Sequence, residues 1–315
     1  MEQQPPDVDI DVVVVNWNGR HLLTSCLAHL ARQEAPHQVI VADNASHDGS
    51  VEMLRAEHPE VSVVALPENV GFGAGNNRGV ASGDAPYVVL VNNDVDVAPG
   101  FLERIVQPLR DDPAVGAVAG LTTRPGTNVV DQFGVQLDAG LCAYARATGQ
   151  DPDAMEPGPL AAPCGAAVAY RRTAYEQVGG FDETLFAYSE DLDLGLRLLA
   201  AGWTFADAPG ARGVHLGGAS TGAGSPMQRK LGAFGRGFVL GRYRRPSAAG
   251  QVHAAVVDLA VVVFALLRYR TVVPLTERVR GFRAARRTPR QPVPAELIDR
   301  RITLRSALAR LAGGA

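Results

Sequence analysis

Short apolar runs alternate with amphipathic segments along the first 120 residues of this chain. Runs of five or six residues rich in valine and isoleucine predict buried strands at 11–15, 38–42, 61–66, 87–91 and 115–120. Helical spacing or helix-start signals predict helices between them at 21–33, 50–57 and 99–110. Strands that alternate with helices predict the α/β class, with a mostly parallel central sheet flanked by helices.

The chain loses this regularity between residues 122 and 163. Glycine and proline are frequent there, as in GQDPDAMEPGPLAAPCG, so we expect a long loop or a small subdomain. Long loops in compact domains usually carry function. Regular structure is predicted to resume with a strand at 166–170, helices at 173–178 and 190–201, and short strands at 204–207 and 213–216.

Charge divides the chain into two regions. Residues 1–227 contain 12 Arg and 29 Asp or Glu, for a net charge of −17, whereas residues 228–315 contain 18 Lys or Arg and 4 Asp or Glu, for a net charge of +14. We therefore predict an α/β domain over 1–225 and a basic, partly apolar helical region over 226–315. The acidic body disfavours nucleic acid as a partner, and the basic region favours an anionic membrane surface or another polyanion.

The basic region contains the apolar run AAVVDLAVVVFALL at 254–267, which Asp258 interrupts. Fourteen helical residues span about 21 Å, less than the ~30 Å hydrocarbon core of a bilayer. Arginines, among them Arg242 and Arg268, flank the run on both sides. Two interpretations stay open: a helix at the membrane interface, or an apolar helix packed on the catalytic domain.

The cysteines and the N-terminal sequence indicate the cellular location. The three cysteines, Cys26, Cys142 and Cys164, form neither a disulfide framework nor a metal-binding spacing, which suits a reducing compartment. The sequence MEQQPPDVDIDVVVV has no basic segment before its apolar run, so no signal peptide is expected. These features favour the cytoplasm. From residue 283 on, the basic and proline-broken terminus is expected to be poorly ordered.

The segment YVVLVNNDVD at 87–96 runs from a predicted strand directly into amides and carboxylates. These are Asn92, Asn93, Asp94 and Asp96. In an open α/β sheet, ligands bind at the carboxyl ends of the strands. Oxygen ligands at such a position suit Mg²⁺ or Mn²⁺. The alternative is a polar turn with an Asx cap.

Two other segments offer groups for a nucleotide. Asp43 and Asn44 follow the second predicted strand, where an acid can accept hydrogen bonds from a base or a ribose, or can simply cap a turn. The segment NVGFGAGNN at 69–77 is glycine-rich and allows close backbone approach to phosphate or sugar. It imitates a dinucleotide fingerprint, but Asn76 replaces the third glycine, which disfavours a nicotinamide dehydrogenase.

A third acidic cluster lies in FAYSEDLDLGLR at 186–197, where Glu190, Asp191 and Asp193 start a predicted helix. One acid suffices as a helix cap, so three point to additional chemistry, and a carboxylate beside a bound alcohol can act as a general base. His215, in GVHLGGAST, precedes a Ser-Thr pair and could complete an oxygen-rich Mn²⁺ site. A lone histidine is more often structural.

Taken in order, these motifs resemble the family 2 glycosyltransferases, and within them the bacterial rhamnosyltransferase-like branch. The resemblance covers about residues 8–222 and rests on VVVVNWNG, VADNASHDGS, ENVGFGAGNN, VNNDVD, PCGAAVAYRR, VGGFDE, YSEDLDLGLRLLAAGW and VHLGGAST. It implies a GT-A fold and inverting transfer of a sugar from a nucleoside diphosphate sugar to a glycan or polyprenyl-linked acceptor. The donor implied is a deoxythymidine diphosphate rhamnose.

The resemblance also implies roles for particular residues. Asp191 matches the general base, with Glu190 beside it. Asp94 matches the acid that binds Mn²⁺ or Mg²⁺, Asp96 is an additional acid, and His215 matches a position that binds metal in some relatives. Nucleotide-sugar binding is expected from Asn16, Asn18, Asp43, Asn44, Asn69, Gly71, Gly73, Asn76, Asn77, Asn92 and Asn93.

Two alternatives remain beside glycosyl transfer. A nucleotidyltransferase acting on sugar phosphates would carry a glycine-rich, Lys- or Arg-bearing loop after the first strand, where this chain has NWNGRHLL. An inactive sugar-binding relative is supported by Asn92, which stands where the family usually has the first acid of a DxD motif. The pair Glu190-Asp191 argues against loss of activity.

Overall fold

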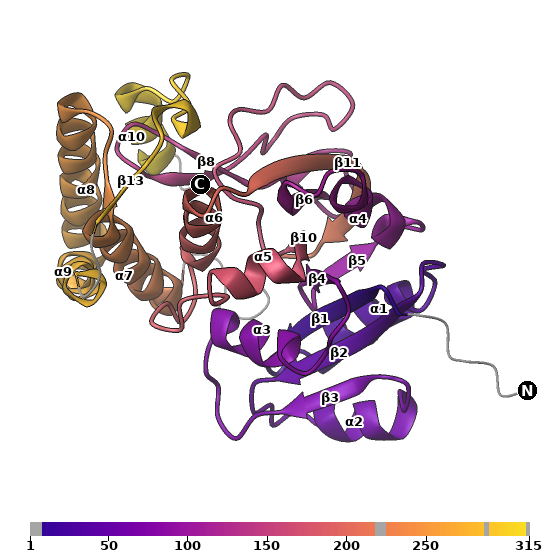
Figure 1. Ribbon diagram of the computed structural model, residues 1–315. Helices are drawn as coiled ribbons and strands as arrows, with labels where there is room; N and C mark the ends of the chain where they lie inside the picture. Colours follow the sequence, from indigo (N-terminus) through magenta and orange to yellow (C-terminus); the bar gives the residue numbers. More distant parts are fainter. Residues whose placement is uncertain (1–7, 218–224, 287–289, 313–315) are drawn as a thin grey trace, which may run out of the picture.

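The computed structural model describes residues 8–217, 225–286 and 290–312, and their arrangement is shown in Figure 1. The main sheet has the strand order β3-β2-β1-β4-β10-β6-β11-β5, and β7 pairs with β6 beside this path. Its strands are β1 (Ile10–Asn16), β2 (His37–Asp43), β3 (Ser62–Ala65), β4 (Tyr87–Val91), β5 (Val95–Val97), β6 (Val115–Thr123), β7 (Val130–Gln132), β10 (Ala167–Arg171) and β11 (Thr204–His215).

The predicted mostly parallel α/β sheet is confirmed. Strands β1 to β4 pair in parallel, as do β6 and β11. Strand β10 lies between β4 and β6 and is antiparallel to both, and β5 is antiparallel to β11. Because β10 runs against β4, its first residues meet the last residues of β4 at the same edge of the sheet.

Helices cover both faces of the sheet. One buried cluster joins β1, β2, β4 and β6 to α1 (Arg20–Leu30), α2 (Ser50–Glu57) and α4 (Phe101–Asp111). A second cluster on the opposite face includes residues of α3 (Phe72–Val80), α5 (Arg172–Gln177) and α6 (Glu190–Ala200). The central strands β1, β4, β6 and β10 are buried on both faces, which explains why they read as continuous apolar runs in the sequence.

The structure refines two predictions for the middle region. The 122–163 segment, expected to be a long loop or a small subdomain, contains β7 and a small hairpin of β8 (Val135–Leu137) and β9 (Ala143–Ala145). The two short strands expected at 204–207 and 213–216 form the single strand β11, which is irregular between Ala208 and Arg212. Pro209 and Gly210 lie inside this irregularity, and they are the residues that made one strand look like two.

The C-terminal region is helical and packs on the rest of the molecule. It contains α7 (Pro226–Arg242), β12 (Tyr243–Arg244), α8 (Ala248–Tyr269), α9 (Val273–Ala285), β13 (Gln291–Pro292), a 3₁₀ turn (Ala295–Leu297) and α10 (Leu304–Ala312). The expected poor order after residue 283 is wrong for residues 290–312, because Leu297 and Ile298 are buried in a shared apolar cluster. Helix α8 has 22 residues rather than fourteen, and by length and composition it is able to cross a membrane.

Helix α6 is held from two sides. Leu194 and Leu198 face the sheet cluster. Leu192 and Leu196 belong instead to a cluster that includes Val239 of α7, Val293 after β13 and Leu297 of the 3₁₀ turn. The C-terminal region therefore forms part of the support for the acidic N-terminus of α6.

Candidate active site

A cavity of about 460 Å³ opens at the carboxyl edge of the sheet. Its walls come from the strand ends, the α3 and α6 N-termini and the start of α7. The lining residues are Val15, Trp17, Asn44, Asn69, Gly71, Phe72, Asn92, Asn93, Asp94, Asp131, Gln132, Cys164, Ala166, Phe186, Ala187, Tyr188, Glu190, Asp191, His215, Gly217, Met227 and Gln228. Nine of the sequence-predicted site residues are therefore brought together: Asn44, Asn69, Gly71, Asn92, Asn93, Asp94, Glu190, Asp191 and His215.

The strand pairing places the segment 92–94 in the cavity wall. The backbone N–H of Asn92 donates to the carbonyl oxygen of Ala166 at 3.2 Å, which continues the β4–β10 ladder one step beyond the strand. The Asn93 side chain donates to Oδ1 of Asn16 at 2.8 Å. Both contacts fix the turn that exposes the Asp94 carboxylate to the cavity.

Asp94 lies next to His215. The pairing of β11 with β5 brings the two together, since the N–H of Leu216 donates to the carbonyl of Asp94 at 2.9 Å. Oδ1 of Asp94 is 3.3 Å from Nε2 of His215, and Nδ1 of His215 is 2.7 Å from Oδ2 of Asp131. Burial opposes the charged imidazole, but hydrogen bonds and charge from Asp131 and Asp94 outweigh burial and raise the pKa of His215 to about 9.

Asp94 and His215 fit a divalent cation with open coordination positions. A carboxylate and an imidazole nitrogen 3.3 Å apart face the same cavity, and a cation bound between them would replace the proton on Nε2. Among residues 8–217, 225–286 and 290–312 no group of three or more His, Cys, Asp or Glu is arranged as a metal cage. Two protein ligands are typical where a substrate's phosphates supply others.

Glu190 and Asp191 are the first two residues of α6, and both line the cavity. The preceding Tyr188 and Ser189 both have left-handed backbones, with φ of 69° and 73°, which turns the chain sharply into the helix. Oε2 of Glu190 and Oδ1 of Asp191 are buried and lack a hydrogen-bond partner among the described residues. Buried unpaired carboxylate oxygens are costly, and two of them at a cavity indicate a site that meets a ligand.

The same burial sets the protonation of this pair. Burial raises the pKa of Asp191 to about 6, although hydrogen bonds from Gly165 and Cys164 oppose the rise. Burial and then the charge of Asp191 raise the pKa of Glu190 to about 8. Hydrogen bonds favour the ionised form of Asp191, whereas the charge of Asp191 disfavours ionisation of Glu190, so Asp191 is the group of the pair that ionises first and is able to accept a proton.

Two glycines allow close approach around this turn. Gly71 precedes α3 with φ +91°, and a Cβ there would lie 2.3 Å from the carbonyl oxygen of Phe186. Gly235 of α7 packs on the left-handed turn itself, because a Cβ there would lie 2.5 Å from the carbonyl oxygen of Tyr188 and 2.7 Å from Oγ of Ser189. The C-terminal region thus contacts the Tyr188–Ser189 turn, which orients Glu190 and Asp191.

Asn16, Asn18 and Asp43 are not among the residues that line the cavity. The Asn16 side chain donates to Oδ1 of Asp43 at 3.0 Å, and Oδ2 of Asp43 accepts from the N–H of Ser46 at 2.9 Å. Asn18 has φ 50° and accepts from the N–H of His47. These three residues connect the loops after β1 and β2 by hydrogen bonds and so support the site. Their neighbours Trp17 and Asn44 line the cavity.

Four other predicted site residues also lie outside the lining. Gly73 packs on Phe181, and Asn76 bonds within α3. Asn77 donates to the carbonyl of Phe181 and accepts from Tyr175. Asp96 accepts from the Ser25 hydroxyl at 2.8 Å. The Ser220-Thr221 pair lies outside the described residues.

Sequence reasoning missed several residues of the cavity wall, among them Trp17, Asp131, Gln132 and Cys164. Gln132 accepts a hydrogen bond from the Cys164 thiol at 2.6 Å. Trp17 lies between two asparagines already selected, so its position in NWN was an available signal. Asp131 and Gln132 belong to a three-residue strand inside the segment without periodicity, and no local pattern marks them.

Comparison with known proteins identifies the family and the fold. The family model described as "Glycosyl transferase family 2" matches residues 11–179, which is more than half of the chain. Two solved structures share the fold: the mannosyltransferase PcManGT from Pyrobaculum calidifontis in complex with GDP-Man and Mn²⁺, and GalNAc-T7 with UDP, GalNAc and Mn²⁺. The first has a TM-score of 0.55 at 19% identity and covers 99% of this chain and 83% of that one. The second has a TM-score of 0.61 at 13% identity and covers 89% and 56%.

Sequence relatives narrow the class. The N-acetylglucosaminyl-diphospho-decaprenol L-rhamnosyltransferase of Mycobacterium tuberculosis is 32% identical over 238 residues, 68% of this chain and 78% of that protein. An N-acetylglucosaminyltransferase of Rhizobium meliloti is 27% identical over 64% of this chain and 50% of its own length. The fold is that of the GT-A glycosyltransferases. The chain belongs to glycosyl transferase family 2, is a glycosyltransferase, and is rhamnosyltransferase-like, as its motifs predicted.

Proposed function

We propose that this enzyme transfers a sugar, with inversion, from a nucleoside diphosphate sugar to a hydroxyl of a lipid-linked glycan acceptor. The observation that carries the proposal is the meeting, in one cavity, of the Asp94–His215 pair and the buried carboxylate of Asp191. Asp191 takes the proton of the acceptor hydroxyl as its oxygen attacks the anomeric carbon, and the bond to the diphosphate breaks. Mn²⁺ or Mg²⁺ held by Asp94 and His215 would offset the charge developing on that diphosphate.

The donor and acceptor are proposed from relatives. The mycobacterial relative is named as a rhamnosyltransferase acting on N-acetylglucosaminyl-diphospho-decaprenol. We therefore propose a deoxythymidine diphosphate rhamnose donor and a polyprenyl-diphosphate glycan acceptor of the cell envelope. Such an acceptor is held in a membrane, so the enzyme would act in the cytoplasm at the inner face of the plasma membrane. Trp17, which lines the cavity near Asn44, offers an aromatic face to the base or sugar.

The alternatives are less well supported. A nucleotidyltransferase would surround its triphosphate with basic side chains, yet the cavity walls formed by the described residues contain no lysine or arginine. An inactive sugar-binding relative has no need of two adjacent buried carboxylates that each keep one oxygen without a partner among the described residues, which is costly.

Donor hydrolysis tests the proposal. Slow release of nucleoside diphosphate would be measured for a panel of nucleotide sugars with Mn²⁺, Mg²⁺ or EDTA. Release from one donor that is lost in EDTA is expected. Release that persists in EDTA would show that the enzyme does not need a divalent cation. If no donor is hydrolysed, and none is consumed when a polyprenyl-diphosphate N-acetylglucosamine is added, the proposed activity is wrong.

The packing of α7 on the Tyr188–Ser189 turn gives a prediction with a matched control. Gly235→Ala places a methyl group 2.5 Å from the Tyr188 carbonyl, so the turn must shift and the base is misplaced. We expect transfer to slow by roughly tenfold to a hundredfold. Gly232→Ala, on the same helix, meets nothing within 4 Å. It should keep the wild-type rate and raise the Tm, because alanine favours helix by about 1 kcal/mol. Equal rates for the two variants would show that the contact does not position the base.

A further inference from the structure

Helix α8 (Ala248–Tyr269) has its polarity reversed relative to a helix of a water-soluble domain. The side that faces the protein carries mostly small residues and one polar residue: Gly250, His253, Ala254, Val257 and Ala265 are buried. The opposite face is apolar and open to solvent, with Val252, Leu259 and Leu267 exposed by 64%, 64% and 78%. Val263, Phe264 and Leu266 extend this face, and Val272, Leu275 and Val279 continue it onto α9. An apolar surface of this extent indicates a covering partner.

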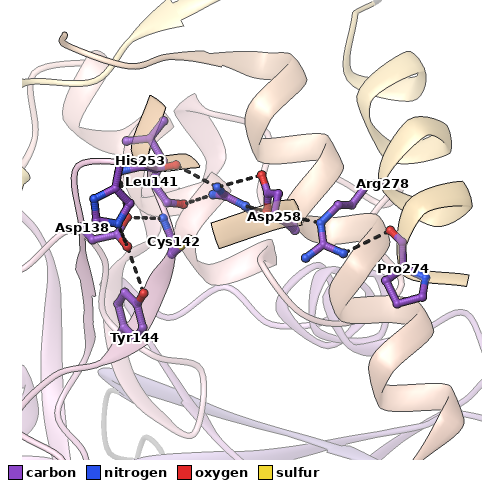
Figure 2. Close-up of polar contacts among 10 residues, drawn as sticks. Asp138, Leu141, Cys142, Tyr144, His253, Asp258, Pro274 and Arg278 are labelled. Carbon is purple, nitrogen blue, oxygen red and sulfur yellow. Dashed lines mark hydrogen bonds and ion pairs between the residues drawn. The ribbon is translucent and has the colours of Figure 1, made fainter. Parts of the chain in front are cut away.

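The inward face of α8 is fixed by buried polar contacts, which Figure 2 shows. Asp258, the residue that breaks the apolar run, pairs with Arg236 of α7 at 3.1 Å and with Arg278 of α9 at 3.3 Å. Nε2 of His253 is 3.0 Å from Oδ2 of Asp138, which follows β8. The orientation of α8 is thus set by ion pairs on one side only, and the apolar side is free to meet a partner.

These contacts also argue against a membrane-spanning α8. Asp258 lies near the middle of the helix and is joined to arginines of two neighbouring helices. If α8 crossed a bilayer, Arg236, Arg278 and the α7–α9 pair would be drawn to the hydrocarbon centre, where each charge is costly. A helix that lies along the surface keeps these ion pairs above the acyl chains and buries only its apolar face.

The charges around the apolar face favour an anionic bilayer as the occupant. Arg268 and Arg270 at the end of α8, and Arg280 and Arg283 on α9, are exposed. The region 228–315 carries a net charge of +14. Two copies of this region would repel one another, whereas anionic headgroups attract it.

The same surface adjoins the cavity. The guanidinium of Arg229 lies 4.1 Å from the ring centroid of Tyr269, the last residue of α8. The residues just before it, Met227 and Gln228, line the cavity. The start of α7 therefore bridges the apolar face and the reaction site.

We propose that the exposed face of α8, continued on α9 and rimmed by arginines, is a membrane-docking surface that seats the enzyme in the plane of an anionic leaflet. Docked in this way, the enzyme takes its lipid-linked acceptor past Met227 and Gln228, so the acceptor part of the inference rests on the proposed function. Membrane binding itself does not require turnover.

Flotation of the full chain with vesicles tests the docking surface. Wild type should float with phosphatidylcholine–phosphatidylglycerol vesicles, bind phosphatidylcholine alone weakly, and be released by alkaline carbonate. Leu259→Asp with Leu267→Asp should lower the partition coefficient at least about tenfold. Arg268→Glu with Arg283→Glu should lower it about tenfold on anionic vesicles only. Ala56→Asp and Arg55→Glu, exposed on α2, which Figure 1 shows away from α8, are the controls and should bind as wild type.

Other outcomes would overturn the proposal. Resistance to carbonate would mean that α8 spans the bilayer. A wild-type dimer in vesicle-free solution that Leu259→Asp with Leu267→Asp converts to monomer would mean that a second copy covers the face. Wild-type binding by both double variants would exclude this surface. Donor hydrolysis, measured without vesicles, should be unchanged in the variants, so its absence in wild type would contradict the proposed function and leave the binding result intact.

Discussion

Asp191→Asn is expected to reduce sugar transfer by about 10²–10⁴-fold while donor binding is largely retained. Asparagine keeps the shape of the side chain but cannot accept the proton of the acceptor hydroxyl. Donor affinity should change little, because the carboxylate of Asp191 faces the acceptor in the proposed reaction. Single-turnover transfer and equilibrium titration with donor separate the two effects. A variant with near-wild-type transfer would show that Asp191 is not the base.

The pH profile provides a second measurement on the same residue. Burial raises the pKa of Asp191 to about 6, and a base acts only when it is deprotonated. The rate should therefore fall as the pH decreases through about 6 and stay level above it until other groups titrate. If the residual rate of Asp191→Asn falls at low pH as the wild-type rate does, a group other than Asp191 causes that fall.

Asp94→Asn is expected to give the other large loss. Removing one group that stabilises developing charge costs roughly 10²–10³-fold in rate. Because Asp94 and His215 are the protein groups proposed to hold the cation, the variant should also need more Mn²⁺ for half-maximal rate. The measurement is the transfer rate as a function of Mn²⁺ concentration.

Asp96→Asn is the matched control for this prediction. Its carboxylate accepts from Ser25 outside the cavity, so the rate and the Mn²⁺ requirement should stay near wild type. Equal losses in the two variants would mean that the segment 94–96 matters for folding rather than for the cation. A loss confined to Asp96→Asn would transfer the proposed metal role to that residue.

The sequence alone predicted those helices and strands that have a clear periodic pattern of apolar residues. Ser50–Glu57 and Tyr87–Val91 were predicted with the bounds that the structure shows, since each combines a clear period with polar ends. The carboxyl ends of β1, β2 and β4 were also expected at one edge, and their residues do meet there. Asn92 and Asp94, which follow β4, line the cavity for this reason.

What the sequence did not predict depends on contacts between distant segments. Asp131 meets His215 across 84 residues because β7 pairs with β6, and a three-residue strand leaves no periodic signal. The support of α6 by Gly235 was equally hidden, because its reason is the backbone of a turn 47 residues earlier. The length of α8 was underestimated since its first turns, AAGQVH, are not strongly apolar.

Strand β10 is synthesised after both of the strands between which it lies. It fills the gap between β4 and β6, yet its residues follow β4 by about 80 positions, which takes roughly 4–16 s at translation rates of about 5–20 residues per second. During that interval both strands present unpaired, apolar edges that other chains can bind. The gap between β4 and β6 closes only when β10 inserts and Arg172, the next residue, forms its buried ion pair with Asp11 of β1. The newly made enzyme is therefore most exposed to aggregation, and to capture by chaperones, before its sheet is complete.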